Sequence, residues 1–271
     1  AVCMLALAAP RAMAETNSHY VSNNEQFADA VRTINNESKI GDENEIVLMQ
    51  DITLGGNYIL TNGKTTTIKG KEGEDRKISI KGKNAGITVT GEKTVLNLGV
   101  EGYAEKLTID GNAKGAFITV SGGATAHMYE NVTLQNRQQV DQACVVLEEN
   151  SVFNMHGGVI QNCKGKYGGV SLKNGSGFIM EGGTISGCSA SEGGGLYAEN
   201  STITIEGGTF KCVNPAWTLN CNDNDAATIT VKGGSFYQFD PSNVTVGEGE
   251  IFIADGYHVV QNGDWYTVVK N

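Results

Sequence analysis

The chain has 271 residues, of which 36 are glycine and three are proline, and aromatic residues make up only 7% of it. Glycine far exceeds its usual share of about 7%, so the composition indicates many short strands with tight turns and excludes a disordered Pro/Gly-rich linker. The formal net charge is −10. Because an acidic surface repels phosphate backbones, no nucleic-acid partner is expected. Only segment 64–83 is locally basic, and we expect it to be a solvated face.

The N-terminus begins within an apolar run, Ala1 to Ala9, which Pro10 ends and which the small-x-small sequence Ala12-Met13-Ala14 follows. This pattern predicts a signal peptide over residues 1–14, truncated at its start, with cleavage before Glu15. A buried N-terminal helix is the alternative. We therefore expect a secreted, extracellular or cell-surface protein. The run is too short to span a bilayer and no later segment is apolar enough, so the chain is not expected to be an integral membrane protein.

Residues 15–45 are expected to form an N-terminal cap that contains an amphipathic helix. Phe27, Ala30, Val31 and Ile34 recur at i, i+3, i+4 and i+7, which places them on one apolar stripe. Ser22 with a glutamate three residues later, Glu25, predicts a capping box at the start of this helix.

A Gly-Gly pair recurs in the second half of the chain at steps of 25, 25 and 26 residues: Gly157-Gly158, Gly182-Gly183, Gly207-Gly208 and Gly233-Gly234. Alignment on these pairs gives three columns in which every residue is apolar. The columns are Phe153, Phe178, Ile203 and Ile229; Met155, Met180, Ile205 and Val231; and Ile160, Ile185, Phe210 and Phe236. The residues between these columns are mostly polar, which is the period-two alternation of strands with one buried face.

A unit of about 25 residues cannot bury its own inner face, but stacked units turn each column into a continuous ladder. The sequence therefore predicts an all-β fold, a right-handed parallel β-helix. We expect a solenoid of about eight coils of about 25 residues over 46–240, with fading repeats upstream. Residues 241–271 should form a C-terminal cap, a hairpin around Asn262-Gly263 that lays Trp265 and Tyr266 over the last coil.

Right-handed β-helices often carry the active sites of polysaccharide lyases and glycosidases, which have recognisable sequence patterns. The chain has no Asp-Asp pair and no Gly-His-Gly segment, and its few arginines follow no recurrent acidic register. Glu181 and Glu206 stack one coil apart, but they share an outward column with His156 and Lys232, which is typical of ordinary solvated surface. No catalytic residue and no cofactor is predicted.

Metal ligation is not expected either. The four histidines are isolated in the sequence: His19, His127, His156 and His258. Asp223 and Asp225, in the run Asn-Asp-Asn-Asp, are weak calcium candidates because the glycine and distal glutamate of an EF-hand loop are missing. A polar turn is the preferred interpretation of that run.

Cysteines and aromatic residues leave two weaker signals. Cys163 and Cys188 occupy the same repeat position 25 residues apart, so they could form a disulfide across neighbouring coils. Buried thiols that pack as small apolar residues are the alternative. Tyr167, Tyr197 and Trp217 fall near corners, where a ring could stack on a sugar or could simply cover the coil beneath it.

The segment from Gly177 to Tyr197, Gly-Phe-Ile-Met-Glu-Gly-Gly-Thr-Ile-Ser-Gly-Cys-Ser-Ala-Ser-Glu-Gly-Gly-Gly-Leu-Tyr, resembles the Gly-Gly repeats of bacterial adhesin-like, pectin-lyase-like β-helix surface proteins. The resemblance covers residues 145–271 well and the earlier chain only in general style. It implies a non-catalytic, adhesin-like surface protein that binds a glycan, or a host or bacterial surface protein, along the solenoid. The alternative function is a polysaccharide-active lyase or glycoside hydrolase with an unrecognised site.

Overall fold

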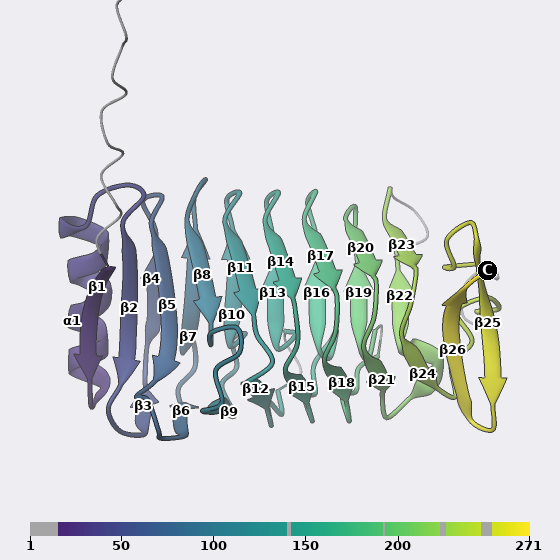
Figure 1. Ribbon diagram of the computed structural model, residues 1–271, viewed down its shortest axis with the longest axis horizontal. Coiled ribbons are helices and arrows are strands. Elements are labelled where there is room, and N and C mark those ends of the chain that lie inside the picture. Colours follow the sequence, from purple (N-terminus) through teal and green to yellow (C-terminus); the bar gives the residue numbers. More distant parts are fainter. Residues whose placement is uncertain (1–15, 140–141, 192, 223–225, 245–250) are drawn as a thin grey trace, which may run out of the picture.

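The structure is a computed structural model that describes residues 16–139, 142–191, 193–222, 226–244 and 251–271. The predicted signal peptide at 1–14 lies outside these residues. The described chain is nearly all β and forms a solenoid of about eight turns, each of about 26 residues, with parallel sheets and one helix near the N-terminus. The predicted parallel β-helix is confirmed, and Figure 1 shows its coils side by side along one axis.

Three sheets, here named A, B and C in the order in which each coil visits them, form the walls. Sheet A has nine strands: β1 (Thr16–Val21), β2 (Glu43–Leu48), β5 (Thr65–Gly70), β8 (Val95–Leu98), β11 (Thr125–Met128), β14 (Val152–Met155), β17 (Gly177–Met180), β20 (Thr202–Ile205) and β23 (Thr228–Val231). Sheet C has seven: β4 (Asn57–Leu60), β7 (Gly86–Thr90), β10 (Ile118–Ser121), β13 (Val145–Leu147), β16 (Val170–Leu172), β19 (Leu196–Ala198) and β22 (Leu219–Cys221).

Sheet B has ten strands, eight of them from the coils. These are β3 (Ile52–Leu54), β6 (Arg76–Ile80), β9 (Leu107–Gly111), β12 (Val132–Gln135), β15 (Val159–Gln161), β18 (Thr184–Ser186), β21 (Thr209–Lys211) and β24 (Ser235–Tyr237). The last two, β25 (Tyr257–Asn262) and β26 (Trp265–Lys270), form an antiparallel hairpin that extends the sheet beyond β24. The short helix η1 (Pro215–Trp217) precedes β22.

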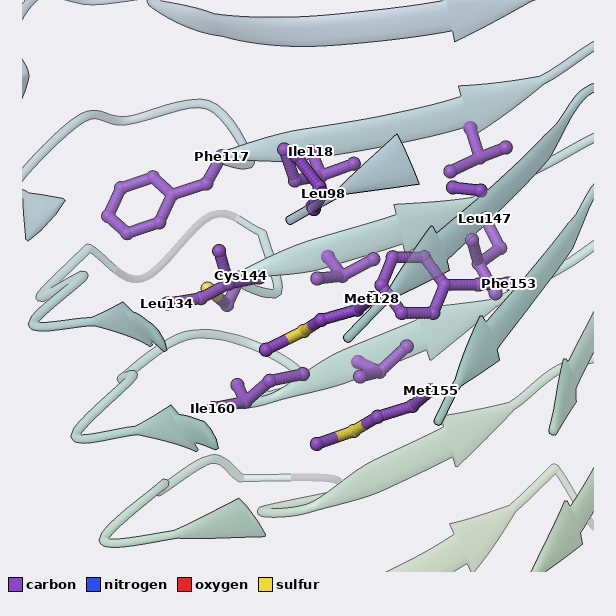
Figure 2. Close-up of a cluster of buried hydrophobic side chains, with 14 of the residues drawn as sticks. Leu98, Phe117, Ile118, Met128, Leu134, Cys144, Leu147, Phe153, Met155 and Ile160 are labelled. Carbon is purple, nitrogen blue, oxygen red and sulfur yellow. The ribbon is translucent and has the colours of Figure 1, made fainter. Parts of the chain in front are cut away.

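The three predicted apolar columns all face the interior. In register, Phe153 pairs with Phe178, and Ile160 with Ile185. All twelve column residues are buried, the most exposed being Ile229 at 8%. Side chains from the three sheets meet in the centre of the coil, as Figure 2 shows for the region around Met128 and Phe153.

The second glycine of each Gly-Gly pair makes the corner between sheets A and B. Gly183 has a φ of +89°, in the left-handed region that L side chains rarely adopt. A Cβ on Gly183 would lie 2.6 Å from the carbonyl oxygen of Gly158 in the preceding coil. Both facts require glycine there, which explains why the pair recurs with the coil period.

The helix α1 (Asn24–Glu37) and strand β1 close the N-terminal end of the stack (Figure 1). The predicted apolar stripe is confirmed, because all four of its residues are buried. The predicted capping box is wrong by one position. Asn23 is the N-cap and accepts a hydrogen bond from Gln26 N, while the Gln26 side chain accepts one from Ser22 N. Asparagine caps as well as serine does, and glutamine serves at the third helical position.

Lys64 fixes the other end of this helix. Its ammonium donates to the carbonyl oxygens of Ile34 and Asn35 at 2.7 and 2.6 Å, and the residue is only 4% exposed. The basic segment 64–83 is therefore not wholly a solvated face, as the sequence suggested. A cation is favourable at this position because the last carbonyls of a helix lack partners within it and carry partial negative charge.

At the C-terminal end, the predicted capping hairpin is confirmed. The predicted turn is wrong by one position: Asn262 pairs with Trp265, so the two turn residues are Gly263 and Asp264. The Trp265 ring packs edge-on against Tyr237 of the last coil, with the ring centroids 5.3 Å apart. The hairpin thus covers the strand edge that the last coil would otherwise expose.

Candidate functional site

The described surface contains hollows of about 570, 430 and 250 Å³. The largest is lined by turn residues such as Asn62 and Lys93 and has no aromatic wall. The smallest lies below the range of about 300 to 1,000 Å³ usual for ligand sites. The 430 Å³ hollow falls within that range and contains two tyrosines and an ion pair. We call it the tyrosine pocket; it is lined by Tyr20, Glu45, Val47, Lys69, Gly70, Lys71, Glu72 and Tyr103.

The floor of the tyrosine pocket is the outward face of sheet A at its N-terminal edge. Tyr20, Val47 and Lys69 lie side by side on β1, β2 and β5, one from each neighbouring strand. Period-two alternation turns these residues outward, because Ile46 and Leu48 point into the core. Tyr20 is 64% exposed, whereas Val47 is only 6% exposed. The pocket therefore has a buried apolar residue, Val47, at its base and an exposed aromatic residue, Tyr20, at its edge.

An ion pair crosses the pocket. Lys69 Nζ lies 2.7 Å from Glu45 Oε1, and Ser18 Oγ donates to the other carboxylate oxygen of Glu45 over 3.2 Å. The same ammonium lies 5.8 Å from the centroid of the Tyr103 ring, a cation–π distance. Burial raises the pKa of the Tyr103 phenol, although Lys69 opposes this effect. The hydroxyl is thus protonated at neutral pH and able to donate.

Tyr103 is held in place by the long loop between β8 and β9. The backbone N–H of Gly73 donates to Glu105 in this loop over 2.7 Å. The backbone N–H of Gly102 in turn donates to Glu130 of the next coil over 2.6 Å. The loop is therefore tied to the coils on both sides, and the Tyr103 ring is pre-positioned opposite sheet A.

This combination suits a sugar. The negative face of an aromatic ring attracts the weakly positive C–H bonds on one face of a pyranose. A carboxylate and an ammonium can accept from and donate to the hydroxyl groups at the ring edge.

The outward column predicted from Glu181 and Glu206 exists, but its acids are occupied by basic partners. Glu181 Oε2 lies 2.7 Å from His156 Nδ1, and Glu206 Oε1 lies 3.6 Å from Lys232 Nζ. Neither carboxylate is therefore free: Glu181 is hydrogen-bonded to His156 and Glu206 is paired with Lys232.

The histidines of this region are not isolated, contrary to their spacing in the sequence. His127 Nδ1 lies 2.9 Å from His156 Nε2, and the rings are parallel within 3°. Glu181 accepts a hydrogen bond from His156 Nδ1–H, and the facing nitrogens of the two imidazole rings share a second hydrogen bond. Tyr129 stacks on His156 with centroids 5.2 Å apart. Burial and the nearby His156 lower the pKa of His127, while Glu181 opposes them.

Three further sequence expectations have different outcomes. Cys163 and Cys188 are buried free thiols in this structure, so the proposed bridge stays a prediction. Tyr167 and Tyr197 stack on each other with centroids 4.5 Å apart and do not meet the tyrosine pocket, and Trp217 lies in η1. Asp223 and Asp225 lie outside the described residues. Among the residues that are described, no group of three or more histidine, cysteine, aspartate or glutamate side chains could hold a metal ion.

Sequence reasoning missed Tyr20 and Tyr103. Tyr20 precedes the helix in a segment assigned only to the cap, and Tyr103 lies in a loop without a repeat to align it. The one available signal was the local excess of lysines at 64–83, which includes Lys69 and Lys71 of the pocket wall.

Within the described part of the chain, no helix has both the length and the apolar character needed to cross a membrane. The sequence matches no protein-family model, no curated protein and no solved structure. The proposal of a function below therefore rests on the fold and on the surface residues.

Proposed function

We propose that this protein is a non-catalytic, adhesin-like module, secreted or at the cell surface, that binds a glycan in the tyrosine pocket. The observation that carries the proposal is that an exposed ring, Tyr20, and a ring in an anchored loop, Tyr103, line the same pocket as the Glu45–Lys69 ion pair. The volume of about 430 Å³ accommodates a small number of sugar units. The resemblance of the repeat to adhesin-like surface proteins supports the same function.

An array of glycans and extracellular-matrix proteins, probed with residues 15–271, tests the proposal. We expect binding to a defined set of glycans, weakened at least tenfold by Tyr20→Ala and by Tyr103→Ala, because each change removes a stacking surface. Tyr266→Ala, on the hairpin at the opposite end of the solenoid, is the matched control and should bind as the wild type does.

Two outcomes would contradict the proposal. One is glycan binding that neither pocket variant weakens while both variants stay folded. The other is binding restricted to matrix proteins, which would indicate a protein ligand on another part of the solenoid.

A polysaccharide-active enzyme is the second candidate function, favoured by one observation. The chain Glu181–His156–His127 orients an imidazole in the way that a general base requires. Release of reducing ends or of unsaturated products from a polysaccharide panel, abolished by Glu181→Gln, would establish this function in place of the first. We expect no such release.

A further inference from the structure

The sheets of the solenoid end in edge strands, and the chain blocks some of these edges with its own groups. At the N-terminal edge of sheet C, the side chain of Asn35 on α1 donates to the carbonyl oxygen of Ile59 on β4 over 2.7 Å. At the C-terminal edge of sheet A, Val231 N donates to Phe252 O over 2.7 Å, and Ala254 N donates to Val231 O over 2.9 Å. Backbone groups engaged in this way are not available to another chain.

Strand β25 forms a different kind of edge. It is the outermost described element at the C-terminal end of the stack (Figure 1), and it pairs with β26 on one side. Asn271 N donates to Gly256 O over 2.9 Å, which makes these two residues a hydrogen-bonded pair of the antiparallel ladder. Such pairs alternate with pairs whose N–H and C=O groups point away from the partner strand. In this register Tyr257, Val259 and Gln261 direct their backbone groups away from β26.

Most of these outward groups have no backbone partner in the described ranges. The Tyr257 N–H donates to the carbonyl oxygen of Ala254 over 3.2 Å, but the N–H and C=O groups of Val259 and Gln261 make no such bond there. The strand is six residues long, and its sequence, Tyr-His-Val-Val-Gln-Asn, contains no proline and no lysine, which are common protections of an edge strand. A row of unpaired backbone groups without such protection is a template for another strand.

The geometry of this edge fits a second copy of the same strand. Antiparallel pairing about a two-fold axis at Val259 places that residue opposite its own copy and Tyr257 opposite Gln261 of the other chain. The two Val259 residues then exchange both of their backbone hydrogen bonds. Each Gln261 N–H donates to the Tyr257 carbonyl oxygen of the other copy. Both chains use the same groups, so the contact closes on itself and adds no further copies.

The charge distribution also favours self-pairing at this strand. The whole chain has a formal net charge of −10, so most contacts between two copies bring acidic surfaces together. Strand β25 has no aspartate, glutamate, lysine or arginine, so self-pairing sets no such side chains directly opposite each other. The same pairing places Val260, which is 47% exposed, opposite His258 of the other copy. An aromatic ring beside a β-branched side chain is a favourable cross-strand pair.

We propose that two copies of this chain pair edge to edge through β25 and form a tail-to-tail dimer. Sheet B then continues from one copy into the other, and each hairpin covers the edge of its partner. The N-terminal ends lie farthest from the contact (Figure 1), so the two tyrosine pockets lie at opposite ends of the dimer. The dimer does not depend on what these pockets bind, but it makes any ligand binding there bivalent.

Sedimentation of the full chain over a range of concentrations up to about 1 mM tests the proposal. We expect a molar mass that rises with concentration toward twice that of the chain. Gln261→Pro removes an outward N–H and leaves the hydrogen bonds to β26 intact, because residue 261 makes none of them. It should raise the dissociation constant of the dimer about tenfold or more, since the dimer loses that bond from both copies.

Gln261→Ala is the matched control. It loses the same side-chain contacts, with Gly263 and Tyr266, but keeps the backbone N–H, so it should dimerise as the wild type does. Circular dichroism checks that both variants are folded. A monomer at the highest concentration, a dimer that Gln261→Pro leaves unchanged, or a dimer that both variants abolish would overturn the proposal.

Amide hydrogen exchange of the wild type gives a second readout that needs no variant. The amides of Val259 and Gln261 should exchange fast in dilute protein and more slowly as the dimer forms. The amide of Val260, which bonds to Thr267 of β26, should be protected at every concentration. Equal protection of the Val259 and Gln261 amides at all dilutions would show that the chain itself covers this edge, and the proposal would be wrong.

Discussion

The coils from β14 onward and the coils before β11 share one architecture but build it differently. In the later coils the interior is apolar and repetitive, with stacked rings such as Phe210 and Phe236, whose centroids lie 4.8 Å apart. Followed back toward the N-terminus, the sheet A column that contains Phe153 becomes Ala126, Leu96, Thr66, Asn44 and, in β1, Asn17. The same inward position thus changes from a phenyl ring to an amide.

The early coils tolerate this because their buried polar groups have partners. Asn44, 1% exposed, donates to the carbonyl of Thr65 over 3.1 Å and accepts from Ser38 Oγ over 2.7 Å. Lys64 likewise donates to the backbone carbonyls of Ile34 and Asn35. At the boundary between the two regions, the buried Arg137 donates to five backbone carbonyls. A buried polar group that is fully hydrogen-bonded costs little, whereas an unpaired one costs about 1–3 kcal/mol. The comparison teaches that the later coils are apolar in every aligned column, whereas the earlier coils, which also hold the tyrosine pocket, combine apolar ladders such as Ile46 and Ile68 with hydrogen-bonded polar residues.

The largest expected effect breaks an apolar ladder. Ile185→Asp places a charge between Ile160 and Phe210, neither of which can pair with it. We expect a loss of about 4 kcal/mol or more in the free energy of unfolding, or failure to fold. Chemical denaturation measures it. Thr184→Asp, on the same strand but facing outward, is the control and should change stability by about 0.5 kcal/mol or less. Equal losses in the two variants would refute the register.

The next effect breaks an anchor. Arg137→Met keeps most of the side-chain volume but leaves five carbonyl oxygens without their donor. We expect a loss of about 3 to 5 kcal/mol, since the five hydrogen bonds that the buried guanidinium donates are lost together and each contributes roughly 1 kcal/mol. The control is Arg32→Met on α1, whose ion pair with Asp29 is solvent-exposed, and which should be nearly neutral. A melting temperature equal to that of the wild type would show that Arg137 is not an anchor.

The smallest effect concerns the boundary between the two regions, where His127 on β11 meets His156 after β14. The lowered pKa of His127 means that the folded chain resists protonation there, whereas the unfolded chain takes up a proton below about pH 6.5. The free energy of unfolding should therefore fall as the pH drops below that value. His19, whose pKa burial also lowers, contributes in the same direction.

Thermal midpoints measured between about pH 8 and pH 5 test this linkage. His127→Gln should flatten part of the decline and leave the share that is due to His19. A decline of the same size in wild type and variant would remove His127 from the explanation.

By itself the sequence determined the solenoid, its coil length, its register and both caps. Period-two alternation fixes which face of a strand is buried, and a constant repeat places the same position of each coil above the last, as Ile160 and Ile185 show. These signals are local or strictly periodic, so they can be recognised in the sequence without knowledge of the tertiary structure. The column of Cys163 and Cys188 could be predicted for the same reason.

Only the tertiary structure decided which side chains from irregular segments meet. Tyr103 reaches sheet A through a long loop, and His127 meets His156 across coils whose spacing departs from 25 residues. Arg137 lies one coil below Cys163, as the hydrogen bond from Lys164 N to Arg137 O shows, and its side chain is fully buried. From the sequence alone, an arginine suggests an exposed position. Such contacts depend on loop lengths and on the hydrogen-bond partners that fold around a polar group. Neither leaves a periodic trace in the sequence, because each occurs once and is satisfied by backbone atoms that any residue supplies.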